Sequence, residues 1–283
     1  MKKAIVTVLL FCVTLSVSCT PRTAEDFFKR GYAYEEKGEY DMAIADYTEA
    51  IRLKPDYFQA YNGRARAYRG NGELDMAIAD YTEIIRFTSD FSLAYGWRGN
   101  VYLEKGEYDM AIADYTEAIR LDSNNDYAYF RRGDAYYGKG ESDKAIADYT
   151  EAIRLNPNNA DAYFWRGDAY YGKGDYNSTI TDFTEAIRLE PDNAFVYLSR
   201  GLAYERKGEY DKAIADFTEA IRLDSNDIFA YRWRGNVYLE KGDYDRAIAD
   251  FEALKINPNL EKEVRDEIER DIELARQARD MNW

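Results

Sequence analysis

The pattern of apolar and polar positions along this chain repeats every 34 residues, seven times in succession. Within one repeat, the fourth and eleventh residues are aromatic, the eighth and twentieth are small, and the twenty-fourth is aromatic again. In the copy that starts at residue 92 these are Tyr95, Tyr102, Gly99, Ala111 and Tyr115. Spacings of three and four residues place side chains on one face of a helix. Each repeat is therefore expected to contain two amphipathic helices.

Glycine stands at the fifteenth place of each copy, where a left-handed turn ends a helix most easily. These residues are Gly38, Gly72, Gly106, Gly140, Gly174, Gly208 and Gly242. A second break follows near Pro55, Pro157, Pro191 or Pro258, and Asp56, Asn158 and Asp192 are expected to cap the helix after it. Two breaks per copy predict a helix–turn–helix unit.

A fixed period of this length is typical of stacked repeats that bury one continuous core. The predicted copies are 24–57, 58–91, 92–125, 126–159, 160–193, 194–227 and 228–260. The positions of the aromatic, small and glycine residues resemble the tetratricopeptide repeat family. That resemblance implies an all-α, right-handed superhelical solenoid of antiparallel helix pairs with a concave groove. The departures are local: Ala65, Thr179 and Ile84 replace the usual Gly, Ala and Ala.

Residues 261–283 do not continue the repeat. Val264, Ile268, Ile272 and Ala275 follow at helical spacings in a charged segment. This pattern predicts a C-terminal capping helix that covers the last repeat, and a partner-binding helix is the alternative.

Residues 1–18 have the features of a secretory leader, with Lys2 and Lys3 before the apolar run 4–17. The leader ends at Cys19, and this junction resembles a bacterial lipoprotein signal in which Cys19 is lipidated. The family's usual Leu three residues before the Cys is Ser16 here. Ordinary cleavage after Ser18 is the alternative. We expect residues 19–23 to form a short tether, and the protein to be an exported, periplasm-facing or surface-exposed lipoprotein that meets the membrane only through its lipid anchor.

The formal charge of the chain is −15, and it contains no His. An acidic surface argues against nucleic acid as a partner and, through self-repulsion, favours a monomer. The absence of His removes the commonest general base and metal ligand. No phosphate-binding loop or zinc spacing occurs, so we predict a non-enzymatic protein without cofactor or metal.

Arginine at the seventh place and aspartate at the twenty-third occur in every copy, as in Arg166 and Asp182. The two interpretations are a ligand-binding ladder and ion pairs within each repeat. Equal counts at fixed positions favour the ion pairs.

Partner recognition is expected where the copies differ. The resemblance implies that the second, fifth, ninth and twelfth residues of the first helix line the groove. The candidate residues are Arg66, Arg69, Asn100, Tyr127, Phe130, Asp134, Tyr137, Phe164, Asp168, Tyr171, Leu198, Leu202 and Asn236. They make repeat two basic, repeats four and five an aromatic trough with acids, and repeat six apolar.

Aromatic and arginine side chains dominate the energetics of interfaces. We therefore predict a scaffold that binds a peptide segment or helix of envelope or host proteins, with apolar and basic side chains, in its groove. In this family, a clamp for a C-terminal carboxylate uses the fifth and ninth places of one repeat and further groups in the next two repeats. The nearest match is Arg232 and Asn236, in the last repeat, so chaperone-tail binding is not predicted. The alternatives are a carrier of a small apolar or cationic ligand between repeats four and six, and a self-assembling element.

Overall fold

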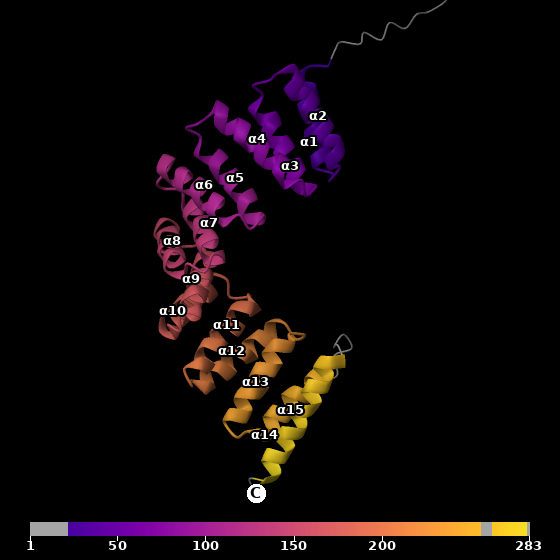
Figure 1. Ribbon diagram of the computed structural model, residues 1–283. Helices are drawn as coiled ribbons and strands as arrows, with labels where there is room; N and C mark the ends of the chain where they lie inside the picture. The colour runs from indigo at the N-terminus through magenta and orange to yellow at the C-terminus, as the bar shows by residue number, and fades with distance from the viewer. Residues whose placement is uncertain (1–21, 256–261, 282–283) are drawn as a thin grey trace, which may run out of the picture. The chain divides into compact units, whose positions relative to one another are not determined.

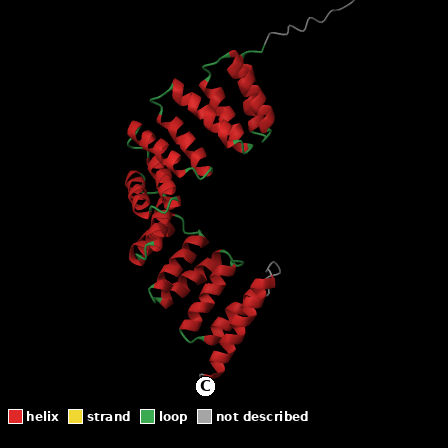
Figure 2. Cartoon of the chain, viewed as in Figure 1, coloured by secondary structure: helices red, strands yellow, loops and turns green. Residues whose placement is uncertain are grey.

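The computed structural model describes residues 22–255 and 262–281. These residues form fifteen α-helices joined by short loops, with no strand among them (Figure 2). The all-α helical-repeat fold predicted from the sequence is confirmed. Residues 1–21, with Cys19 and the predicted leader, lie outside the described part.

Each repeat contains a first and a second helix, and the two kinds alternate along the chain (Figure 1). The first helices are α1 (Ala24–Glu35), α3 (Phe58–Gly70), α5 (Ser92–Glu104), α7 (Asp126–Gly138), α9 (Ala160–Gly172), α11 (Ala194–Arg206) and α13 (Ile228–Glu240). The second helices are α2 (Tyr40–Leu53), α4 (Leu74–Phe87), α6 (Tyr108–Leu121), α8 (Ser142–Leu155), α10 (Tyr176–Leu189), α12 (Tyr210–Leu223) and α14 (Tyr244–Lys255). A last helix, α15, spans Lys262–Met281.

The chain divides into two compact units, residues 1–83 and 84–283. In each unit, consecutive helices pack against one another in chain order. The boundary falls within α4.

All seven glycines at the fifteenth place adopt positive φ angles between 73° and 79°. Because this backbone conformation is unfavourable for residues with a Cβ, they end the first helix of each pair, as predicted. The N-cap residues predicted for the first helices lie one residue before the observed N-cap residues. Asn159, not Asn158, caps α9 by accepting a bond from the amide of Ala162 at 3.0 Å, because the proline turn extends one residue further.

The core lies between the paired helices. The aromatic residue at the twenty-fourth place of each repeat lies on the second helix. Its ring packs closely against the first helix because the residue at the eighth place there is small. A Cβ added at Gly201 would lie 2.6 Å from the ring of Phe217, which is fully buried. Such close approach explains why large and small residues alternate at fixed places.

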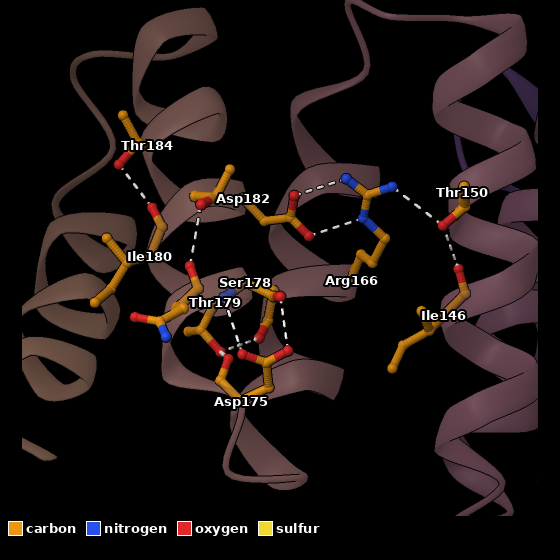
Figure 3. Close-up of polar contacts among 12 residues, drawn as sticks. Ile146, Thr150, Arg166, Asp175, Ser178, Thr179, Ile180, Asp182 and Thr184 are labelled. Carbon is orange, nitrogen blue, oxygen red and sulfur yellow. Dashed lines mark hydrogen bonds and ion pairs between the residues drawn. The ribbon is translucent and has the colours of Figure 1, made fainter. Parts of the chain in front are cut away.

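The seventh-place arginines pair with the aspartate sixteen residues later, so the ion-pair interpretation is confirmed. In Figure 3, Arg166 donates from Nη2 and Nε to the two carboxylate oxygens of Asp182, at 2.7 and 2.8 Å. Its Nη1 donates to Thr150 of the preceding repeat at 3.1 Å. Arg64, Arg132, Arg200 and Arg234 make the same bond to the preceding repeat, so these arginines join two repeats as well as the two helices of their own repeat.

Thr179 replaces the alanine that is usual in the family, and its side chain is fully buried. Its hydroxyl lies 2.9 Å from the carbonyl oxygen of Asp175 and 3.1 Å from that of Gly167. Because both acceptors are backbone groups, the extra hydroxyl is satisfied inside the core.

The C-terminal helix α15 packs its apolar face on α14. Ile268, Ile272 and Ala275 are buried against a cluster that includes Phe251 and Leu254. A helix therefore lies against α14 where the sequence predicts a capping helix. None of the helices in the described residues is both long and apolar enough to cross a bilayer.

Candidate partner-binding groove

Core tyrosines hold the polar residues of the first helices in place. The hydroxyl of Tyr115 donates to Oδ1 of Asn100 at 2.8 Å, and that of Tyr149 donates to Oδ1 of Asp134 at 2.9 Å. Both tyrosine rings are fully buried. Hydrogen bonds from these buried tyrosines therefore fix the orientation of the Asn100 and Asp134 side chains.

Asp134 is also held by the adjacent arginine. Nη1 of Arg131 lies 2.8 Å from Oδ2 of Asp134, and its Nε lies 3.3 Å from Oδ1 of Asn100. Burial raises the pKa of the Asp134 carboxyl to about 6, against the opposing effects of Arg131 and Tyr149. Desolvation therefore outweighs the favourable interactions of the charged carboxylate at this site.

A pocket of about 420 Å³ opens above this network. Its walls include the side chains of Phe130, Tyr137 and Trp165, with Asp134 and Asp161 as the acidic groups. A volume of this size lies within the range of small-ligand and peptide side-chain sites.

Aromatic rings follow one another from α7 to α11. The Tyr137 and Trp165 ring centroids are 5.8 Å apart, those of Trp165 and Phe164 are 5.3 Å apart, and those of Phe164 and Phe195 are 5.5 Å apart. Trp165 is 37% exposed and Phe195 60% exposed. Rings held in mutual contact lose little conformational freedom when a partner binds.

Two further cavities adjoin the first. One, of about 200 Å³, shares Asp161 and Trp165 with the 420 Å³ pocket. The other, of about 750 Å³, shares Glu190 and Phe195 with the second and adds Asp192, Asp224 and Asp227. We call these three cavities the aromatic groove. Seven of the residues that line it are charged, and all but Arg131 are acidic.

The structure brings several predicted residues into this groove, namely Phe130, Asp134, Tyr137 and Phe164. Others lie beside it. The hydroxyl of Tyr127 donates to Asn100 at 3.0 Å, and Asp168 accepts from the Tyr137 hydroxyl at 2.5 Å. The Tyr171 ring packs on Tyr176, with centroids 5.5 Å apart. Leu202 is half-buried against the repeat-six core, and Asn236 is half-buried on α13.

Leu198 corrects the prediction for repeat six. It is only 7% exposed and packs with Phe217 and Val237. Because the neighbouring helix α13 covers it, this side chain belongs to the core and not to a partner surface.

Arg66 and Arg69 lie on α3, in the first unit. The guanidinium of Arg66 pairs with both carboxylate oxygens of Glu35, at 2.7 and 2.8 Å. The basic character predicted for repeat two is therefore partly neutralised within the first unit.

Sequence reasoning missed Arg131 and Trp165, which stand at the sixth place of their repeats. The sixth place holds five different residue types in the seven copies: Lys29, Gly63, Trp97, Arg131, Trp165, Ser199 and Trp233. Three of the four tryptophans of the chain stand at this place. This variation and the tryptophans could have identified the sixth place as part of the recognition surface.

Arg232 does not form a carboxylate clamp that is open to a ligand. Its Nη2 lies 3.0 Å from Glu267 and 3.6 Å from Asp271 of α15. No group of three or more metal-ligating side chains is found in residues 22–255 and 262–281.

Comparison with known proteins gives repeated matches along the chain. A family model described as TPR repeat matches residues 31–72, 99–140, 133–174 and 167–208. Models described as tetratricopeptide repeat match residues 58–91, 194–227 and 217–249. A search of curated proteins found no match.

Solved structures show the same fold. A tetratricopeptide repeat protein from Parabacteroides merdae has a TM-score of 0.63 and 22% identity, over 89% of this chain and 98% of that one. The C-terminal part of a TPR repeat-containing protein from Cytophaga hutchinsonii has a TM-score of 0.71 and 22% identity, over 84% and 98%. YrrB, described as a TPR protein with an unusual peptide-binding site, has a TM-score of 0.55 and 24% identity, over 65% and 95%.

The fold is that of protein-interaction scaffolds that are generally non-enzymatic, and the matched family model covers more than half of the sequence. This chain belongs to the tetratricopeptide repeat family.

Proposed function

We propose that this protein is a non-enzymatic scaffold that binds a segment of a partner polypeptide in the aromatic groove. The observation that carries the proposal is the row of ring contacts from Tyr137 to Phe195, which leaves two large aromatic side chains exposed. Exposed aromatic side chains beside pockets are the usual anchors of protein interfaces.

Site-directed photo-crosslinking tests this proposal. A photoreactive phenylalanine replaces Phe195, and in a control protein it replaces Met110, which is 48% exposed on α6. We expect the Phe195 position to give a discrete cross-linked partner in the native cell, and Trp165→Ala to reduce that product at least fivefold. Mass spectrometry then identifies the cross-linked segment. Equal products from Met110, or no effect of Trp165→Ala in a protein with unchanged helicity, would reject the groove as the binding site.

We further propose that the protein works in a bacterial envelope, anchored through lipid on Cys19. The support is the order of residues 1–19, with two lysines, an apolar run and a small residue before the cysteine. Envelope assembly, secretion and attachment to a host surface all fit such a scaffold. The mass of the mature N-terminus tests the anchor, since two or three acyl chains add several hundred daltons. Cys19→Ser should release the protein from membranes, and unchanged membrane association would exclude the lipid anchor.

A second candidate function is binding of a small apolar or cationic ligand. The 420 Å³ pocket, with its aromatic walls, favours it. The intact protein would then show a saturable rise in melting temperature with such a ligand, and no polypeptide cross-link at Phe195.

A further inference from the structure

The 200 Å³ cavity between α9 and α11 has the most specific chemistry in the groove. Three aromatic rings line it: Phe164 and Trp165 from α9, and Phe195 from α11. Two carboxylates line it as well, Asp161 from the first turn of α9 and Glu190 just after α10. None of the residues that line this cavity is cationic.

The two carboxylates differ from Asp134, which also lines the groove but is paired with Arg131. In the described part of the chain, Asp161 and Glu190 form no ion pair with a lysine or arginine. Their charges are therefore available to a ligand.

Helix dipoles do not account for both charges. Asp161 lies at the N-terminus of α9, and Glu190 precedes that of α11. Each N-terminus carries about half a positive charge. The two N-termini together offset at most about one of the two negative charges, and the C-terminus of α10, where Glu190 is the C-cap residue, adds about half a negative charge. The cavity therefore keeps a net negative field.

The rings that line the cavity pack on other rings, but no cation of the described residues lies over them. Arginines and lysines lie over many tyrosine rings of this chain, as Arg166 does over Tyr163 at 5.7 Å. No such cation lies over the rings of Phe164, Trp165 or Phe195 within the described residues. The Asn193 side chain, which also lines the cavity, does not cap α11, whereas Asn159 at the same place caps α9.

We propose that this cavity binds the cationic head of an arginine or lysine side chain of the bound polypeptide. Aromatic faces and carboxylates together form the usual site for such a cation. A volume of about 200 Å³ is smaller than drug-sized ligand pockets of roughly 300–1,000 Å³, and it suits one side-chain head. The adjoining 750 Å³ cavity adds Asp192, Asp224 and Asp227, so the segment that continues into it is expected to be basic.

This inference rests on the proposed function for the source of the side chain, and its test does not need the natural partner. The intact protein, labelled with ¹⁵N, is titrated with N-acetyl-arginine methylamide and with its neutral citrulline analogue. The indole N–H resonance of Trp165, assigned with Trp165→Phe, reports binding. We expect a saturable shift with the arginine probe and at least tenfold weaker binding of the citrulline probe.

Matched variants distinguish the effect of the two cavity carboxylates from the effect of the protein's overall negative charge. Asp161→Asn with Glu190→Gln should weaken binding of the arginine probe at least tenfold. Glu240→Gln removes an exposed charge on α13, outside the three cavities, and should change affinity less than twofold. Equal binding of the two probes, or an equal loss in Glu240→Gln, would overturn the inference.

The outcomes also separate this inference from the proposed function. If cross-links at Phe195 persist undiminished in the Asp161→Asn, Glu190→Gln protein, the scaffold function stands and the cation site is rejected. If tetramethylammonium binds more tightly than the arginine probe, the cavity is a site for a free small cation and the inference is likewise rejected. If the arginine probe binds as expected but Phe195 gives no cross-link, the cation site stands and the proposed function fails.

Discussion

Removal of Arg166 should destabilise its repeat far more than removal of a surface arginine nearby. Arg166→Ala leaves the carboxylate of Asp182, which is 3% exposed, without its two bonds of 2.7 and 2.8 Å. It also removes the bond from Nη1 to Thr150. Loss of one partner of a buried ion pair costs about 3–5 kcal/mol, because the remaining charge stays desolvated.

Arg188→Ala is the matched control, on α10 of the same repeat. Arg188 pairs with Glu185 at 2.7 Å, but its side chain is 60% exposed. A solvated i, i+3 pair contributes only about 0.2–0.5 kcal/mol. The two variants therefore change the same residue type and differ about tenfold in expected cost.

The assay is hydrogen exchange of the α9 and α10 amides, since a stacked array unfolds locally and a single global free energy is not well defined. A loss below about 1 kcal/mol for Arg166→Ala, or a loss equal to that of Arg188→Ala, would refute the reasoning. Arg166→Met combined with Asp182→Leu should recover most of the loss, because no charge then remains buried.

Three further predictions concern the charge, packing and cap of the second unit. Burial raises the pKa of Asp134 to about 6 from the usual aspartate value of 3.8. Between these two pKa values the folded state binds a proton that the unfolded state does not, so the free energy of unfolding rises by roughly 2 kcal/mol as pH falls from 7 to 4. Asp134→Asn should flatten the dependence of the urea-unfolding midpoint on pH, and an unchanged slope would contradict the shift. Gly201→Ala places a Cβ 2.6 Å from the ring of Phe217 and should cost about 1–2 kcal/mol, whereas Gly96→Ala meets no atom within 4 Å and should stabilise by up to about 1 kcal/mol, each measured by hydrogen exchange of the helix that carries it. Ile268→Ala empties a fully buried site under α15 and should lower the stability of α14 and α15 by about 2–5 kcal/mol in hydrogen exchange; normal protection of α14 would show that α15 is not needed as a cap.

The order of residues alone determined the repeat, its two helices and the glycine turn between them. The seven positive-φ glycines and the Arg166–Asp182 type of pair follow from fixed places in a 34-residue period. Helical periodicity decides which residues share a face within one helix. Any copy therefore predicts the local structure of the others, and the pairing of the seventh-place arginine was predictable for the same reason.

Only the tertiary structure decided which groove residues meet. Leu198 shares the expected groove positions with Phe164, yet α13 covers it while Phe164 lines a cavity. Trp165 and Asp161 line one cavity with Phe195 because the first helices of successive repeats lie close together. The 34-residue period of the sequence does not give the distances between side chains of different repeats. Contacts between repeats depend on the size of every side chain at each interface, so the recognition surface had to be read from the packed helices.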